Sequence, residues 1–125
     1  MDARDIGKHF EDLALAYLKA HGLALVARNF NCRFGEVDLI LREGETIVFA
    51  EVRYRGTSVR GGGTASVGAA KRAKLIHAAQ TWLQQNPRYA TQPCRFDVVG
   101  CSATLERPQF EWTRNAFDAF GGEMP

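Results

Sequence analysis

The sequence predicts an α/β protein with a central mixed sheet flanked by helices, because helix-like and strand-like patterns alternate along its 125 residues. Two segments repeat apolar residues at helical spacing, one near the start of the chain and one past its middle. Between them, two runs alternate apolar and polar residues as strands do. A chain of this length is expected to form one domain, spanning 1–125, and 46% apolar content is enough for its core.

The first helix is expected from Ala3 to Gly22. Its apolar residues recur every three or four positions, Asp2 or Asp5 can cap its start, and Gly22 can end it. Glu11 falls on the shoulder of the buried face of this helix. A carboxylate in that position can face a cleft.

Three strands are expected next. The segment 23–30 is apolar with poor alternation, whereas 36–42 and 46–54 alternate clearly. A short polar loop containing Glu43 and Gly44 joins the last two, so we expect an antiparallel hairpin.

The second half of the chain begins with a glycine-rich stretch, 55–66, which is expected to be flexible. A second helix is expected from a cap at Ser66 to about Gln85, where Asn-Pro stops it. A strand over 94–103 and a further edge strand around 109–113 complete the sheet. The tail 119–125 is expected to fray.

Positive charge is concentrated in one segment of the chain. Residues 52–96 contain no Asp or Glu and carry a charge of +8, which leaves −6 for the rest of a chain whose net charge is +2. A basic surface beside an acidic site typically meets phosphate backbones. A solvated charged face with no partner is the alternative interpretation.

The cysteines and the N-terminus indicate the compartment. Cys32, Cys94 and Cys101 are odd in number and form no CxxC pair, and the histidines lack zinc-like spacing. The N-terminal segment has no continuous apolar run, so neither a signal peptide nor a spanning helix is expected. We expect reduced thiols in a cytoplasmic protein.

Acidic residues interrupt the two strands of the hairpin. With an even number of loop residues, Asp38 pairs with Phe49 and Glu36 with Glu51, which makes Asp38 and Glu51 diagonal neighbours on one face. An odd loop without a bulge sends them to opposite faces. The other face is expected to be an unbroken apolar surface, formed by Val37, Leu39, Leu41, Val48, Ala50 and Val52.

Clustered carboxylates repel one another, so a cation or a proton has to offset their cost. Oxygen ligands without His or Cys suit Mg²⁺ or Mn²⁺. Arg53 follows Glu51 by two residues and can hold a phosphate beside such an ion. This is the minimal apparatus of phosphodiester hydrolysis. Surface acids paired with nearby arginines are the alternative, although apolar residues on the same face indicate that the face is covered.

The stretch “GEVDLI” followed by “FAEVRYR” resembles the D…ExK core of the PD-(D/E)xK nuclease superfamily. More narrowly, the chain is similar to the YraN family of bacterial proteins, which resemble the archaeal Holliday-junction resolvases. The likeness also covers “GKHFEDLALAYLKAHG”, “VGAAKRAKLIHAAQTWL” and “CRFDVVG”. It implies a restriction-endonuclease-like αβββαβ core. It also implies a Mg²⁺- or Mn²⁺-dependent endonuclease, often a homodimer, that acts on structured or branched DNA.

The resemblance also implies roles for single residues. Asp38 and Glu51 would be metal ligands, Glu11 a further acid near the metal or its water, and Lys71 a phosphate contact. Arg53 completes the expected catalytic set by stabilising the phosphate. The expected DNA-backbone contacts are Arg55, Arg60, Lys71, Arg72 and Lys74.

One residue departs from the family pattern, because Arg53 stands where ExK usually has Lys. Lys can deprotonate or orient the attacking water, whereas Arg stays protonated and supplies only charge. A non-catalytic nucleic-acid-binding protein with a degenerate nuclease site is therefore the alternative function. A protein-interaction domain with a basic face is a third reading.

Overall fold

The computed structural model describes residues 3–54, 67–103 and 106–118, and the predicted α/β class is confirmed. The predicted flexible loop 55–66, with Arg55 and Arg60, and the predicted tail 119–125 lie outside the described residues. The elements, in chain order, are α1 (Ala3–Ala20), β1 (Ala24–Cys32), β2 (Gly35–Glu43), β3 (Thr46–Tyr54), α2 (Ala69–Gln85), a 3-10 turn η1 (Pro87–Tyr89), β4 (Cys94–Ala103) and β5 (Pro108–Phe117).

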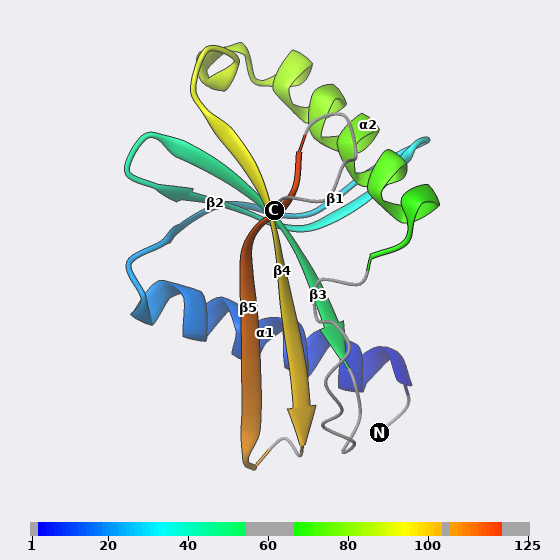
Figure 1. The fold of residues 1–125 in the computed structure, drawn as a ribbon, viewed down its shortest axis with the longest axis vertical. Helices are drawn as coiled ribbons and strands as arrows, with labels where there is room; N and C mark the ends of the chain where they lie inside the picture. The colour runs from blue at the N-terminus through cyan, green and yellow to red at the C-terminus, as the bar shows by residue number, and fades with distance from the viewer. Residues whose placement is uncertain (1–2, 55–66, 104–105, 119–125) are drawn as a thin grey trace.

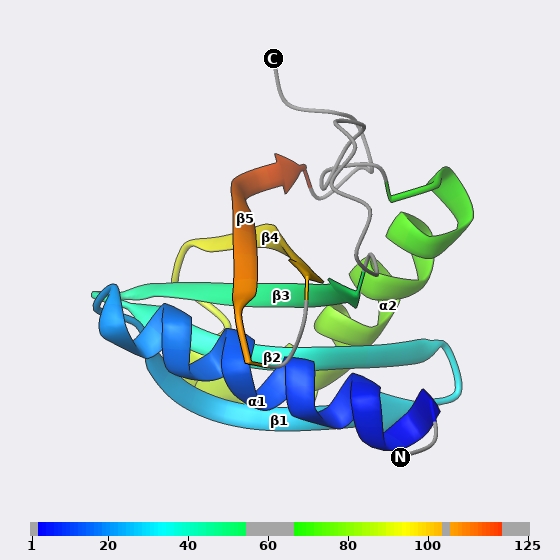
Figure 2. The same cartoon turned by 90° about the horizontal axis from the view of Figure 1, so that it is seen from below.

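The strands of the described residues form one mixed sheet in the order β1-β2-β3-β4-β5. β3 lies at its centre, antiparallel to β2 and parallel to β4, and the parallel connection passes through α2. Helices α1 and α2 lie on opposite faces of the sheet (Figures 1 and 2). The arrangement is consistent with the predicted αβββαβ core. Because α1 and α2 cover β3 on both faces, its backbone is held in place, and the side chains on it have fixed positions.

The first helix ends at the predicted glycine. Gly22 has φ +96°, and its N–H donates to the carbonyl of Lys19 at 3.1 Å. The N–H of Leu23 donates to the carbonyl of Leu18, also at 3.1 Å. This pair of bonds is the Schellman motif, in which glycine readily adopts the left-handed conformation. It turns the chain directly into β1.

The second helix begins later than predicted. Its N-cap is Gly68, whose extended backbone makes no side-chain cap bond, while the predicted cap, Ser66, lies outside the described residues. Instead, the guanidinium of Arg72 donates to the carbonyl of Val67 at 2.8 Å. A side chain from inside the helix therefore ties down the segment that precedes it.

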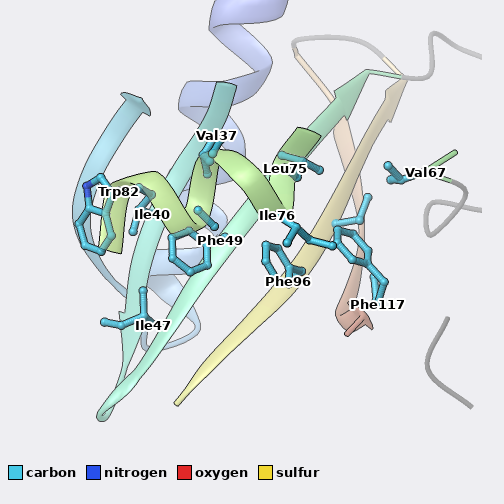
Figure 3. Packing of buried hydrophobic residues seen from close by; sticks show 14 residues of the cluster. Val37, Ile40, Ile47, Phe49, Val67, Leu75, Ile76, Trp82, Phe96 and Phe117 are labelled. Carbon is cyan, nitrogen blue, oxygen red and sulfur yellow. The ribbon is translucent and has the colours of Figure 1, made fainter. Parts of the chain in front are cut away.

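The core between α2 and the sheet is aromatic. Phe49 of β3 stacks on Phe96 of β4 with ring centroids 5.5 Å apart, and its ring meets Trp82 of α2 edge-on at 6.0 Å. Figure 3 shows these rings together with Leu75 and Ile40 in the same layer. Burying each such side chain contributes about 1.5–3 kcal/mol, so this layer holds α2 firmly over β2 and β3.

The hairpin turn lies later along the chain than the predicted register places it. Gly44 and Glu45 alone form it, and Gly44 has φ +60°, as a two-residue hairpin turn requires at its first position. Ile40 therefore pairs with Phe49 and not with Ile47. The predicted register was wrong by two residues, but the loop length is even, so the faces of the strands keep their predicted sides.

The opposite sheet face packs against α1 and differs from prediction at one position. Val37 was expected on this face, but it lies in the core on the α2 side, together with Ile40. The alternation reverses between Val37 and Leu39, where β2 leaves β3. The rest of the predicted apolar face is confirmed on the α1 side: Leu39, Leu41, Val48 and Ala50 are buried there and Val52 packs against them.

Candidate active site

The strands β2 and β3 separate at one end of the hairpin, and Asp38 and Glu51 stand at that point. Their ladder ends at Leu39 and Ala50, beyond which β2 continues to pair with β1 and β3 with β4. The N–H of Val52 donates instead to Oδ2 of Asp38 at 2.9 Å. The Asp38 side chain thus fills the gap between the two strands and reaches the Glu51 side chain.

The carboxyl groups of Asp38 and Glu51 are in direct hydrogen-bond contact. Glu51 is only 8% exposed, and Asp38 is half-buried. Burial and the negative charge of Glu51, with a smaller contribution from Glu11, together raise the pKa of Asp38 to about 8, although the Val52 N–H opposes them. At neutral pH without a cation, Asp38 therefore holds a proton.

Glu11 approaches from α1 on the other side. Its Oε1 accepts hydrogen bonds from Nε and Nη2 of Arg28 at 3.3 and 3.2 Å, and Arg28 also binds Asp12. Its charge reaches Asp38, but its carboxylate is oriented by Arg28. Within residues 3–54, 67–103 and 106–118, no three His, Cys, Asp or Glu side chains gather into a ready metal cluster.

A cation from α2 completes the acidic pair. The Nζ of Lys71 lies 3.6 Å from Oε2 of Glu51. Both residues line an open cleft of about 480 Å³ between the end of β3 and the start of α2. The structure thus brings three predicted site residues, Glu51, Arg53 and Lys71, to one cleft, with Asp38 bonded to Glu51. The cleft is lined by Glu51, Val52, Arg53, Tyr54, Gly68 and Lys71.

The other predicted phosphate contacts are placed differently. Lys74 is exposed one turn after Lys71 on α2, outside the cleft lining. Arg72 is half-buried, with its guanidinium on the carbonyl of Val67. Of the predicted basic contacts that the structure describes, Lys71 alone lines the cleft.

Sequence reasoning did not identify two residues that shape the site. Tyr54 lines the cleft, is 47% exposed, and stacks on Phe10 of α1 with ring centroids 4.5 Å apart. Arg28 positions Glu11. The available signals were an aromatic residue directly after Arg53 and a charged residue within an apolar strand. Neither signal identifies its partner, because the partners are distant in sequence.

A further buried acid, Asp97, has a structural role, because its carboxylate holds neighbouring strands through hydrogen bonds. It is 1% exposed and sits where the β4–β5 register shifts. Its Oδ1 accepts from Nε of Arg95 at 3.0 Å and from the N–H of Asn115 at 2.9 Å, and its Oδ2 accepts from Nε1 of Trp112 at 2.9 Å. These donors fix the bend of β5, visible in Figure 2.

Cys32, Cys94 and Cys101 form no disulfide with one another in the structure. Cys94 is exposed, whereas burial raises the pKa of the Cys101 thiol to about 12. Among the helices of the described residues, none has the length and apolar character needed to span a bilayer.

The chain is similar to proteins of one known family. A family model described as “Uncharacterised protein family UPF0102” matches residues 10–101. A UPF0102 protein of Ectopseudomonas mendocina (strain ymp) is 49% identical over 115 residues, which cover 92% of this chain and 96% of that protein. A UPF0102 protein of Stutzerimonas stutzeri (strain A1501) is 46% identical over 118 residues, covering 94% and 98%. The predicted YraN-family resemblance is therefore confirmed, and the chain belongs to the UPF0102 family.

Proposed function

We propose that this protein is a Mg²⁺- or Mn²⁺-dependent endonuclease that hydrolyses phosphodiester bonds in structured or branched DNA. The observation that carries the proposal is the contact between the carboxyl groups of Asp38 and Glu51; burial together with this contact raises the pKa of Asp38 to about 8. Such a pair destabilises the fold unless a proton or a cation lies between the two groups. Strongly perturbed acids beside a cleft are typical of catalytic sites.

The donor set fits a hard divalent ion. Both carboxyl groups offer oxygen only, and Mg²⁺ is commonly held by one or two carboxylates, with water and substrate phosphate oxygens completing its octahedron. The pair of Asp38 and Glu51 is sufficient by this criterion, without a third protein ligand. A divalent ion held there would polarise the phosphodiester and activate a water for attack.

The neighbouring side chains act on the phosphate and the water. Arg53 and Lys71 line the same cleft and place positive charge where the pentavalent transition state becomes more negative. Arg53 cannot take a proton from the water at physiological pH. Glu11, oriented by Arg28, is the remaining carboxylate near the pair and is suited to position that water.

The DNA substrate follows from charge and resemblance. Residues 52–96 carry +8, and Lys74 is exposed near the cleft. The preference for branched DNA and the possible homodimer rest on the similarity to resolvases. The proposed basic contacts Arg55 and Arg60 lie outside the described residues.

The test is cleavage of labelled four-way, flapped and linear DNA in Mn²⁺. Wild type, Asp38→Asn, Arg53→Lys and the control Glu36→Gln are made and purified identically. Glu36 is an exposed acid two residues from Asp38 on the same strand. Glu36→Gln therefore tests whether the removal of any nearby negative charge changes cleavage. We expect cleavage by wild type and Glu36→Gln, and none by Asp38→Asn.

The presence of Arg53 favours one second candidate function, a nucleic-acid-binding protein whose nuclease site is no longer catalytic. This second function predicts that wild type binds DNA, with an affinity that falls steeply as the salt concentration rises, but does not cleave it. Cutting gained in Arg53→Lys would indicate an intact site that lacks only a proton-transfer group. DNA binding without cleavage in all variants would favour the binding protein over the endonuclease.

A further inference from the structure

We propose that the turn between β1 and β2, together with the adjoining face of α2, stacks an unpaired nucleobase of the DNA strand that enters the cleft. The residues concerned are Arg33, Phe34, Lys74 and His77, here called the base platform. This inference rests on the proposed function, because it names the feature of the DNA that the same site would select.

The centre of the base platform is an aromatic ring held on the surface. Phe34 is 38% exposed, and its ring meets the imidazole of His77 edge-on, with centroids 5.2 Å apart. The guanidinium carbon of Arg33 lies 4.8 Å from the centroid of the same ring. Arg33 and His77 are themselves exposed. Flat π surfaces and a cation are thus presented together to solvent.

The turn that carries Phe34 lies tightly against α2. Gly35 has φ +154°, and a Cβ at that position would lie 3.2 Å from Cβ of Lys74. A larger residue there would push the turn away from the helix. The close approach therefore fixes the ring of Phe34 relative to α2, and a ring held in place loses little entropy when a base stacks on it.

The platform and the cleft lie on adjoining parts of the surface of α2. Lys71, Lys74 and His77 follow one another at a spacing of three residues, and residues at this spacing are neighbours on a helix surface. At about 1.5 Å per residue, Lys71 and His77 are about 9 Å apart along the axis. Lys71 contacts Glu51. The platform is therefore within the reach of a few nucleotides from Lys71, which contacts the acidic pair.

An unpaired base is the occupant that matches both the rings and the charges. Inside a duplex both faces of a base are covered by its neighbours, whereas an unpaired base has a free face for an aromatic ring. Arg33 and Lys74 provide cations for the flanking phosphates. Glu36 is an exposed acid nearby on β2. Arg33, Lys74 and Glu36 together still carry a net positive charge.

The test is metal-free binding of flapped DNA that carries 2-aminopurine as the first unpaired nucleotide, beside the matched linear duplex. Wild type, Phe34→Ala, Phe34→Tyr and Leu25→Ala are compared. Leu25, on β1, is 37% exposed and serves as the matched apolar control. We expect wild type to quench the 2-aminopurine fluorescence. Phe34→Ala should lose the quenching and bind flapped DNA about 5- to 100-fold more weakly, with duplex affinity unchanged.

The remaining variants separate stacking from folding. Phe34→Tyr keeps the ring and should behave like wild type, as should Leu25→Ala. Wild-type quenching by Phe34→Ala would overturn the inference, and so would an equal loss of affinity for flapped and linear DNA, which would indicate only a structural role. No quenching by wild type would also overturn it.

The proposed function is judged separately, by Mn²⁺-dependent cleavage of the same flapped DNA. Cleavage that Asp38→Asn abolishes, combined with quenching that Phe34→Ala retains, would keep the endonuclease and remove the base platform. Quenching that depends on Phe34, without cleavage by wild type, would keep the platform and remove the endonuclease.

Discussion

The Nζ atom of Lys71 lies 3.6 Å from Oε2 of Glu51, and this ion pair joins the start of α2 to the end of β3. The Lys71 side chain is 45% exposed, whereas the Glu51 side chain is only 10% exposed. Removing Lys71 therefore leaves a buried acid without its cation, which affects stability as well as any contact with phosphate. The first prediction separates its contribution to folding from its contribution to DNA binding.

Lys71→Ala is expected to lower the free energy of unfolding by about 1–3 kcal/mol in a urea titration, because it leaves the buried Glu51 without its cation. The same variant should bind DNA more weakly, and the slope of log affinity against log salt should decrease by about one. Lys8→Ala is the control for the loss of one positive charge, because Lys8 forms an ion pair with Asp12 on α1, at 3.9 Å, in which both partners are exposed. An equal loss of affinity in both variants would contradict a specific phosphate contact at Lys71.

Asp38 makes the stability of the metal-free protein depend on pH. Its pKa in the fold is about 8, above the ordinary value of 3.8, so the folded state holds a proton that the unfolded chain releases. This contribution is complete below about pH 4 and is lost as the pH rises through about 8. Melting curves in EDTA should therefore show wild type losing stability from about pH 5 to pH 8.

Asp38→Asn cannot ionise and should lose less stability over the same range. Glu36→Gln leaves the pair of Asp38 and Glu51 intact and should decline like wild type. If Asp38→Asn declines as steeply as wild type, the raised pKa of Asp38 is not the cause.

Binding of a divalent ion should stabilise the fold through the acidic pair. Mn²⁺ at about 100 times its dissociation constant adds about 2.7 kcal/mol to the stability of a protein that binds it only when folded. We expect Mn²⁺ to raise the melting temperature of wild type near pH 8, and to do so far less for Asp38→Asn and Glu51→Gln. An equal shift in all three proteins would place the ion elsewhere.

Asp97 is expected to be a strong determinant of stability. Removing its carboxylate leaves the N–H of Asn115 and the indole of Trp112 without their acceptor and leaves Arg95 partly uncompensated. Asp97→Ala should cost about 3 kcal/mol in urea unfolding. Asp97→Asn keeps an acceptor oxygen and should cost less. A loss below about 1 kcal/mol in Asp97→Ala would show that the β4–β5 bend does not depend on this acid.

Gly35 and Gly7 offer a matched pair of glycine substitutions. Gly35→Ala should destabilise the protein by about 1–2 kcal/mol, because φ is +154° and the new Cβ would crowd Lys74. Gly7 lies in α1 with nothing within 4 Å of a Cβ, so Gly7→Ala should stabilise the fold by about 0.5–1 kcal/mol. Thermal melts compare the two, and a neutral Gly35→Ala would show that the turn can move off α2.

Elements with local signals could be predicted from the sequence alone. The end of α1 followed from Gly22, because the left-handed cap needs no distant partner. β4 occupies the predicted residues 94–103, since its apolar run is bounded by turn residues. The proximity of Asp38 and Glu51 was expected from an even hairpin loop, and the loop is even and the two side chains do meet.

Features that depend on distant contacts could not be predicted in this way. The two-residue shift in register comes from the choice between two even turns, which the strand pattern does not distinguish. The reversal at Val37 comes from the parting of β2 and β3, a property of the whole sheet. The position of the Lys71 amine depends on how α2 packs across the sheet, through contacts between residues far apart in the chain.

The two-residue turn at Gly44 and Glu45 sets a rule for how this family can vary in length. Its insertions and deletions can keep Asp38 and Glu51 together only when they change the turn by an even number of residues, or when a bulge restores the parity. A relative with one extra residue there and no bulge would keep both acids in its alignment and yet hold them on opposite faces of the sheet. Whether the number of residues in this turn is even or odd therefore separates relatives that can form the acidic pair from relatives that have both acids in sequence but cannot bring them together.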